Sequence, residues 1–292
     1  MTDVIPGLSV RASRYDVLFC DVWGVIHNGI SAFKNATEAL CRFREKGGKV
    51  VLLTNSPNPS RFVEAQLKRL GAPRPSYDSI VSSGDVTVSL LAERVDKGIF
   101  RIGPRGELAL FEELKALYGK AAHLVPLKKA QSVLCIGLVD PVREVPEDYD
   151  ALLKAMHVRR LELICANPDI VVEDGGVLLY CAGAIAERYS AIGGKVIHAG
   201  KPHALIYERA IALASAPAPI NRSRVLVIGD AMRTDIKGAC AQGFDSLFVT
   251  SGIHRNELHR GSGAAGLDKA AFRQFLGGAD CMPTAAIPEL VW

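Results

Sequence analysis

Polar residues able to bind a phosphate and a cation stand directly after several short apolar runs of this 292-residue chain. Short apolar runs of this kind are typical of strands buried on both faces of a parallel sheet. Since parallel strands end at one edge of their sheet, we expect these groups to converge although they are far apart in sequence. The set consists of Asp21, Thr54, Asn55, Ser56, Lys201, Asp230 and Asp235.

Asp21 is the leading candidate for a catalytic carboxylate. It ends the apolar run 17–20, and Gly24 and Gly29 follow it, two residues that let the chain turn sharply and approach a ligand. A buried carboxylate at a strand end is costly unless a metal, a lysine or backbone N–H groups compensate for its charge. We therefore expect Asp21 to have such a partner.

Asp21 and Asp230 have the chemistry of a magnesium site, with Asp235 as a further ligand or a supporting group. Mg²⁺ prefers one or two carboxylates together with waters and phosphate oxygens. Phosphoryl transfer needs mainly positioning and charge neutralisation, which Thr54, Lys201 and the metal would supply. A carboxylate beside Mg²⁺ can itself be the nucleophile and pass through an aspartyl-phosphate.

The elements that must position these groups alternate between strand-like and helix-like patterns, which predicts an α/β fold with helices on both faces of a parallel sheet. A separate unit interrupts the first pattern near residue 99, so the chain is expected to be one domain with another inserted into it. The tail from Gly261 is poor in pattern. The expected strands are 17–20, 49–53, 78–82, 99–102, 122–124, 132–137, 162–166, 196–199, 224–228 and 245–250, with a hairpin over 170–180. The expected helices are 36–46, 59–70, 86–94, 107–117, 149–156, 183–191, 204–213 and 236–242.

Composition narrows the classes of partner. The formal net charge is +4, and the longest basic clusters, Lys128–Lys129 and Arg159–Arg160, are too short to indicate nucleic-acid binding. No apolar run reaches the roughly 18–20 residues that cross a bilayer, and the N-terminal residues lack a secretory signal pattern. We therefore expect no membrane partner and a cytoplasmic location. The seven cysteines show no CxxC spacing, which favours free, buried thiols.

Taken together, the four polar segments resemble the motifs of the haloacid dehalogenase-like hydrolase superfamily, and more narrowly its NagD-like, para-nitrophenyl-phosphatase-like subgroup (subclass IIA). Each motif alone is weak, but four in order at predicted strand ends are specific, and the resemblance spans nearly the whole chain. The motifs are Asp21-Val-Trp-Gly-Val with Gly29, Thr54-Asn-Ser, Gly200-Lys201-Pro202 and Gly229-Asp230-xxx-Thr234-Asp235.

The resemblance implies a Rossmann-like core, formed here by residues 1–82 and 183–292, with an α/β cap of the C2 type over 83–182. It also implies dependence on Mg²⁺ and an activity on a small phosphorylated substrate. Asp21 would be the nucleophile, Asp230 a metal ligand, and Thr54 and Lys201 the groups that stabilise the phosphate and the intermediate.

Trp23 departs from the family pattern. Phosphatases of this superfamily carry a second Asp at this position, which protonates the leaving group and later activates water. Indole cannot exchange protons in that way, and general acid/base catalysis contributes about 10²–10⁴-fold to a rate. The predicted metal site keeps its ligand here, because that position contributes its main-chain carbonyl, which Trp23 also has.

Three accounts of Trp23 are open. The chain is a slow phosphatase for substrates with good leaving groups, or His27, whose ordinary pKa lies near neutrality, protonates the leaving group instead. Alternatively, the protein binds a phosphorylated ligand without turnover. A third class, metal-independent dehalogenation, is suggested by the aromatic residue but not by the retained Asp230 and Asp235.

The substrate is expected to be a sugar phosphate, a nucleotide or a cofactor phosphate, selected by residues of the cap. The loops Gly103–Gly106 and Asn167–Asp174 are the candidates for this role. Dimerisation through the cap, which similar proteins often show, is left open by the sequence.

Overall fold

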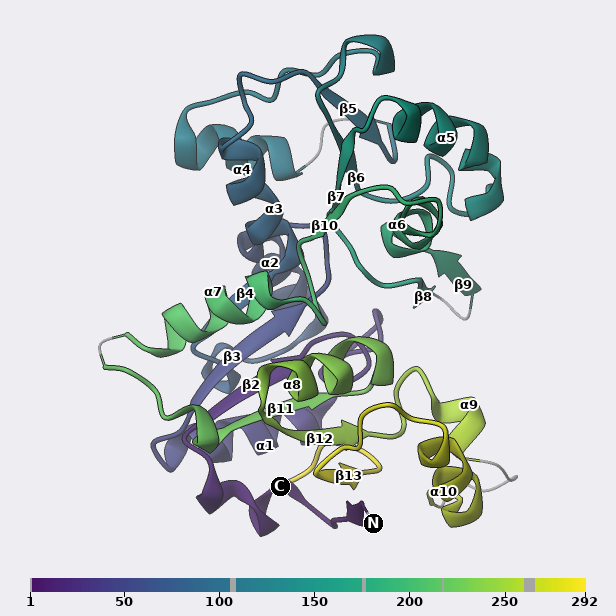
Figure 1. Cartoon of the computed structure of the whole chain (residues 1–292). Helices are drawn as coiled ribbons and strands as arrows, with labels where there is room; N and C mark the ends of the chain where they lie inside the picture. The colour runs from purple at the N-terminus through teal and green to yellow at the C-terminus, as the bar shows by residue number, and fades with distance from the viewer. Residues whose placement is uncertain (1, 106–108, 175–176, 217, 260–265) are drawn as a thin grey trace. The chain divides into compact units, whose positions relative to one another are not determined.

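The computed structural model describes residues 2–105, 109–174, 177–216, 218–259 and 266–292, which divide into two compact units (Figure 1). The first unit comprises Met1–Thr54, Glu64–Val81 and Tyr207–Trp292, and the second comprises Asn55–Val63 and Ser82–Ile206. Each unit contains a parallel sheet with helices, which confirms the predicted α/β class.

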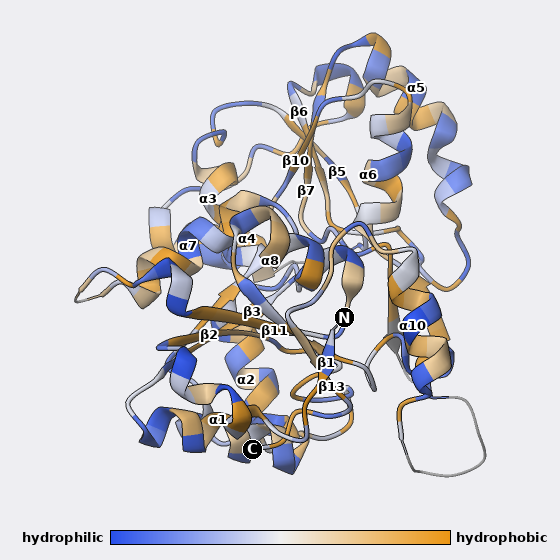
Figure 2. Cartoon of the chain, turned by 60° about the horizontal axis from the view of Figure 1, so that its bottom comes forward, coloured by the Kyte–Doolittle hydropathy of each residue, from blue (hydrophilic) through white to orange (hydrophobic). Residues whose placement is uncertain are grey.

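A seven-stranded sheet forms the centre of the first unit. The pairings that run from β1 through β13, β12, β11 and β2 to β3 are parallel. The residues of β2 and β11 are all buried, and Figure 2 shows that β2, β3 and β11 are mostly hydrophobic, as expected for strands covered on both faces. The strand order is β1 (Asp3–Val4), β13 (Ala285–Ile287), β12 (Asp245–Val249), β11 (Val225–Gly229), β2 (Val17–Asp21), β3 (Lys49–Thr54) and β4 (Ser79–Ser82).

The helices of the first unit connect these strands. Two of them, α2 and α7, begin in segments grouped with the second unit and continue in the first. A π-helical turn, Met232–Ile236, precedes α8. The helices are α1 (Lys34–Glu45), α2 (Ser60–Leu70), α7 (Ala204–Ala214), α8 (Lys237–Gln242), α9 (Arg255–Leu258) and α10 (Lys269–Gly277), with short 3₁₀ turns at Leu8–Val10, Ala12–Arg14, Arg74–Ser76 and Arg222–Arg224.

The second unit has its own four-stranded parallel sheet and a separate antiparallel hairpin. The sheet runs in the order β10 (Val196–His198), β7 (Glu162–Cys165), β6 (Ser132–Cys135) and β5 (Ile99–Ile102), and the hairpin pairs β8 (Val171–Asp174) with β9 (Val177–Tyr180). The helices are α3 (Ser83–Ala92), α4 (Ala109–Tyr118), α5 (Asp150–Val158) and α6 (Ala182–Ala191), with 3₁₀ turns at Leu127–Lys129 and Pro146–Tyr149.

The strand before Lys201 corrects one prediction. We expected 196–199 to belong to the same sheet as the strands before Asp21 and Asp230, but β10 pairs with β7 in the sheet of the second unit. Helix α6, also expected in the core domain, adds Ile185 and Tyr189 to the apolar cluster of the second unit. An apolar run predicts a strand but does not identify its sheet.

Two further expectations differ from the structure. Residues 122–124 form no strand and contribute only a bridge from Leu124 to Ile99. The tail contains α10 and β13, and β13 is the partner of both β12 and the short N-terminal strand β1. β1 and β13 are too short to give a hydrophobic pattern, so pairing between the chain's two ends, and not local sequence, defines them.

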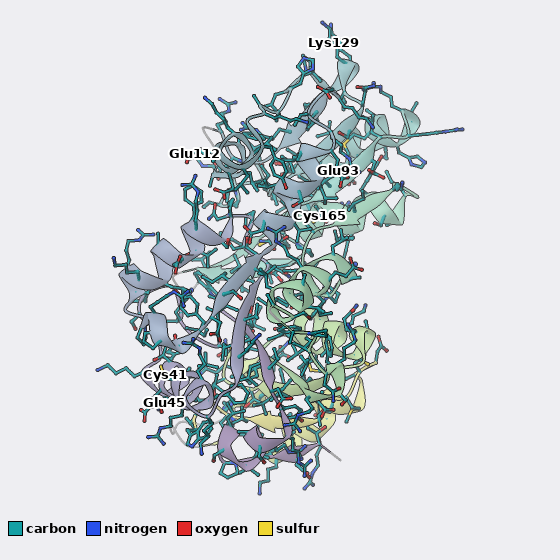
Figure 3. All side chains as sticks on the ribbon, turned by 90° about the vertical axis from the view of Figure 1, so that its left-hand side faces the viewer. Cys41, Glu45, Glu93, Glu112, Lys129 and Cys165 are labelled. Carbon is teal, nitrogen blue, oxygen red and sulfur yellow. The ribbon has the colours of Figure 1, made fainter. Side chains whose placement is uncertain are left out.

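No disulfide joins the seven cysteines, all of which lie in the described ranges, and four of them are buried. Figure 3 shows Cys165 among the strands of the second unit and Cys41 on α1. None of the helices in the described ranges combines the length and the apolar character that crossing a membrane requires.

Candidate active site

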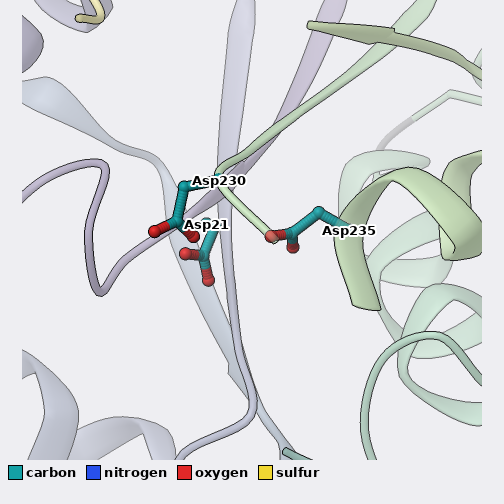
Figure 4. A group of neighbouring side chains, drawn as sticks. All are labelled: Asp21, Asp230 and Asp235. Carbon is teal, nitrogen blue, oxygen red and sulfur yellow. The ribbon is translucent and has the colours of Figure 1, made fainter. Parts of the chain in front are cut away.

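Three predicted site residues come together in the first unit. Asp21 ends β2, Asp230 follows β11 directly, and Asp235 lies in the π-helical turn. One carboxylate oxygen from each lies within 4.8 Å of the others, and all three residues are buried. Figure 4 shows the carboxylates of Asp21 and Asp230 side by side, with that of Asp235 facing them.

Sheet register explains why two of these acids meet. β11 and β2 are parallel neighbours in which Ile228 pairs with Cys20. Both strands therefore end at the same edge, where Asp21 and Asp230 are the first polar residues.

Glycines form the walls around the acids. A Cβ atom on Gly229 would lie 2.1 Å from Cγ of Asp235, and one on Gly24 would lie 2.1 Å from Oδ2 of Asp230. Gly24 also has a φ of +80°, a left-handed conformation that favours glycine. The Gly24 and Gly229 positions thus admit the carboxylates only because they lack a side chain.

Sequence reasoning missed a further wall, the loop after β12. A Cβ atom on Gly252 would lie 1.9 Å from Oδ2 of Asp230, and the Ile253 N–H donates to that same oxygen at 2.7 Å. The Ala231 N–H holds Asp235 in a similar way, at 3.1 Å from its Oδ2. The signal was present in the sequence, since Gly252 also follows a strand that ends at this edge.

The electrostatics of this cluster suit a divalent cation. Three carboxylates held this close repel one another, and burial removes the water that would screen their charges. An arrangement of several carboxylate oxygens is the donor set that hard cations such as Mg²⁺ and Ca²⁺ prefer. Asp21, Asp230 and Asp235 therefore fit the predicted metal in the type and grouping of their donors.

Thr54 belongs to the same unit and the same sheet. It is the last residue of β3 and is buried, and its neighbour Leu53 pairs with Asp21 across the parallel β2–β3 ladder. Register thus brings the end of β3 level with the end of β2.

Lys201 and Asn55 come together in the second unit. The side-chain amide of Asn55 forms hydrogen bonds with both the N–H and the carbonyl of Lys201. Its Oδ1 accepts from the Lys201 N–H at 2.7 Å, and its Nδ2 donates to the Lys201 carbonyl at 3.1 Å. Nδ2 also donates to Oδ1 of Asp169 at 2.8 Å. Gly200 allows this approach, because a Cβ there would lie 2.3 Å from Oδ1 of Asn55. Sequence reasoning predicted that Asn55 binds phosphate, but not that it holds the lysine loop.

Ser56 and the predicted specificity loops lie in the second unit as well. The Ser56 hydroxyl accepts from the Asn58 N–H at 3.2 Å, and its carbonyl accepts from the Gly84 N–H at 3.0 Å. Of the loop Gly103–Gly106, residue 106 lies outside the described residues. In the loop Asn167–Asp174, Asp169 is the residue that contacts Asn55.

Trp23 is half-buried in the first unit and is held by the loop that follows it. Its ring packs edge-on against the ring of His27, with centroids 4.9 Å apart. Gly29, at a φ of +86°, lies so close that a Cβ atom there would be 2.8 Å from the indole.

His27 is buried, and its Nδ1 accepts from the Gly29 N–H at 3.0 Å. Burial lowers the pKa of His27 to about 4, so the ring is uncharged at neutral pH. These properties count against the expectation that His27 protonates a leaving group.

Models of two families match the sequence. One, for haloacid dehalogenase-like hydrolases, matches residues 18–116, and a HAD-hydrolase-like model matches residues 198–269. The crystal structure of a hydrolase of the haloacid dehalogenase-like family from Brucella suis 1330 is 42% identical, with a TM-score of 0.83. The match covers 99% of this chain and 100% of that one.

Two curated relatives are more distant. The D-glycerol 3-phosphate phosphatase of Mycobacterium tuberculosis is 27% identical over 83% of this chain, which spans only 65% of that protein's length. The ribonucleotide monophosphatase NagD of Escherichia coli K12 is 26% identical over 81% of this chain and 88% of its own length. With these matches, the chain belongs to the haloacid dehalogenase-like hydrolases, and within them to the NagD-like subclass IIA.

Proposed function

We propose that this hydrolase cleaves a small phosphate monoester, with Mg²⁺ at the acid cluster and Asp21 as the nucleophile. The observation that carries the proposal is the convergence of three buried carboxylates at one edge of a parallel sheet. The names of the mycobacterial and E. coli relatives, both phosphatases, support the same class of reaction.

Asp21, Asp230, Asp235 and the main-chain carbonyl of Trp23 are the groups proposed to hold Mg²⁺. When bound, the cation would neutralise part of the negative charge of the phosphate and of the transition state. Thr54, Ser56 and Lys201 are proposed to bind the phosphate oxygens, the first two through hydrogen bonds and the third through its charge. Asn55, proposed at first as a phosphate ligand, would also keep the Lys201 loop in position.

The reaction has two steps. A carboxylate oxygen of Asp21 forms a bond to phosphorus as the bond from phosphorus to the ester oxygen breaks, and the ester oxygen leaves with that electron pair and takes a proton from water. Water then attacks the phosphorus of the aspartyl-phosphate, which releases inorganic phosphate, restores the Asp21 carboxylate and gives a proton to solvent.

Sugar, nucleotide and cofactor phosphates make up the proposed substrate range, and within it the esters with the most acidic leaving hydroxyl are expected to be cleaved fastest. The division into a core of residues 1–82 and 183–292 and a cap of residues 83–182 stays a prediction. The cytoplasmic location and a homodimer formed through the cap also stay predictions.

The proposal is tested by measuring phosphate release from a panel of phosphate monoesters with added Mg²⁺ and with a chelator. We expect turnover that needs the metal and that Asp21→Asn reduces by at least roughly 10³-fold, because the amide is a poor nucleophile. Folding of the variant is checked by its thermal unfolding.

Each other outcome identifies a competing function. Phosphate-ligand binding that raises the unfolding temperature without any turnover would favour the ligand-binding alternative. Activity that survives removal of the metal by the chelator would instead favour a dehalogenase-type hydrolase.

A further inference from the structure

We propose that Trp23 makes this enzyme selective for phosphate esters whose leaving oxygen is stable as an anion, such as aryl, enol and acyl phosphates. This inference rests on the proposed function, since it concerns the leaving group of the reaction at Asp21. Trp23 is thus assigned as a specificity-determining residue.

The position of Trp23 in the chain places it beside the nucleophile. β2 ends at Asp21, one buried residue, Val22, follows, and Trp23 comes next. Gly24, the residue after Trp23, packs against the carboxylate of Asp230. Residue 23 therefore lies in the chain between a member of the acid cluster, Asp21, and a residue packed against another member, and its side chain is an indole, which is neither an acid nor a base at neutral pH.

The loop is built to hold an indole here. Gly29 leaves no room for a side chain against the ring, and its left-handed φ is costly for other residues. His27 packs edge-on against the ring, and its own backbone carbonyl accepts from the Gly24 N–H at 2.8 Å. His27 and Gly29 thus hold the aromatic ring, and the Gly24 N–H holds the backbone of His27, so the loop is shaped to accommodate a large side chain at position 23.

The ionisable side chains near Trp23 already have other roles or partners. Asp21, Asp230 and Asp235 form the proposed cation site. His27 is 2% exposed and uses Nδ1 to accept the Gly29 N–H. Within the described part of the first unit, the loop after β2 therefore presents no side chain suited to protonate a departing oxygen.

A leaving group that takes no proton departs as an oxyanion with the electron pair of the broken P–O bond. An aryl, enol or acyl oxygen delocalises that charge, whereas the alkoxide of an alkyl phosphate does not and must recover its proton from water. General acid catalysis contributes about 10²–10⁴-fold in other enzymes, and its absence acts on alkyl esters much more than on aryl ones.

The test is the dependence of kcat/KM on the acidity of the leaving alcohol, measured for a series of substituted phenyl phosphates and for glycerol phosphate. This parameter reports the steps up to departure of the alcohol, so later hydrolysis of the aspartyl-phosphate does not affect it. For the wild type we expect a steep dependence, with p-nitrophenyl phosphate favoured over glycerol phosphate by at least about 10²-fold.

Two variants of equal size separate acid chemistry from space at position 23. Trp23→Asp introduces a carboxyl group able to exchange protons, and Trp23→Asn introduces the same volume without that ability. We expect Trp23→Asp to reduce the preference for aryl esters by roughly tenfold or more, and Trp23→Asn to keep it.

A flat dependence in the wild type, with glycerol phosphate cleaved as efficiently as the aryl esters, would overturn this inference and leave the proposed function in place. An equal change of preference in both variants would also overturn it, because space alone would then explain selectivity. Failure to cleave any ester in the series, or full activity of Asp21→Asn, would instead overturn the proposed function itself.

Discussion

The acid cluster of the first unit and the lysine loop of the second are built by opposite means. Packing fixes the carboxylates, since Gly24, Gly229 and Gly252 lie so close that a methyl group on any of them would collide with Asp230 or Asp235. Hydrogen bonds fix the lysine loop, since the Asn55 amide bonds both the N–H and the carbonyl of Lys201. One region thus depends on the absence of side chains and the other on one particular side chain.

The difference follows from charge. Three carboxylates repel one another, so they cannot stabilise their own arrangement. The glycine walls and two backbone N–H donors must keep them together until a cation compensates for their charge. The loop that carries Lys201 contains both hydrogen-bond donors and acceptors, so hydrogen bonds to Asn55 can fix its position. We expect small steric changes to damage the first region most and lost hydrogen bonds to damage the second.

Among substitutions in the contacts that support the two regions, the largest effect is expected from Gly252→Ala. The added Cβ would lie 1.9 Å from Oδ2 of Asp230, so the carboxylate or the loop that holds it must move. A displacement of about 1 Å in a catalytic group can cost roughly 10²-fold in rate. We predict a fall of that size in kcat/KM together with a higher Mg²⁺ concentration for half-maximal activity.

Gly277→Ala is the matched control, because a Cβ at that position of α10 meets nothing within 4 Å. Unchanged Mg²⁺ activation in Gly252→Ala would show that the glycine walls do not position Asp230.

An intermediate effect is expected from Asn55→Ala. The substitution removes the partners of the Lys201 N–H and carbonyl, and leaving a buried polar group without its partner costs about 1–3 kcal/mol. We predict an unfolding free energy lower by about that amount in denaturant titration and a roughly tenfold loss of phosphatase turnover.

Asn55→Asp sharpens this test, since it keeps the acceptor for the Lys201 N–H but loses the donor to the carbonyl and to Asp169. We expect it to fall between the wild type and Asn55→Ala. Exposed Asn58, three residues on, provides the control, and equal effects of Asn55→Ala and Asn58→Ala would contradict the role given to the amide.

The smallest effect concerns acid stability of the second unit. His198 ends β10 and stacks on His203, with ring centroids 4.0 Å apart. Burial, followed by the nearby charge of His203, lowers the pKa of His198 to about 4 from 6.5. The unfolded chain therefore binds a proton that the folded one does not between about pH 6.5 and 4. The free energy of unfolding is therefore unaffected by protonation of His198 above pH 6.5 and decreases as the pH falls through this window.

We predict that His198→Asn weakens this pH dependence by an amount worth roughly 2–4 °C in Tm, the shift that about 1 kcal/mol gives at this chain size. Thermal unfolding at pH 7.5 and at pH 5 measures it, with exposed His157→Asn as the control. An identical loss of Tm in wild type and His198→Asn would rule out this source of acid sensitivity.

The sequence predicted the acid cluster because its logic is local. Asp21 and Asp230 each follow an apolar run, and adjacent parallel strands place such residues at one edge. It did not predict the sheet to which β10 belongs, because Val196 and Ile197 would suit either sheet equally well. Spatial pairing, which no periodicity encodes, decided that point.

The sequence also could not predict the contacts made by backbone atoms. The Ile253 N–H that holds Asp230 and the clamp of Asn55 on Lys201 depend on the course of loops. Gly252 and Asn55 could be singled out as residues after strands, but not assigned their partners. Residue types predicted the chemistry, whereas the supporting contacts required the structure.

The most direct test of the account is the covalent state of Asp21 during turnover. Wild-type protein is mixed with Mg²⁺ and p-nitrophenyl phosphate, quenched in acid within the first turnovers and mapped by peptide mass spectrometry. The account predicts one phosphoryl group on the peptide that contains Asp21, absent when the metal is chelated and absent in Asp21→Asn. Turnover with no phosphoryl group on that peptide, or with one on another residue, would contradict it.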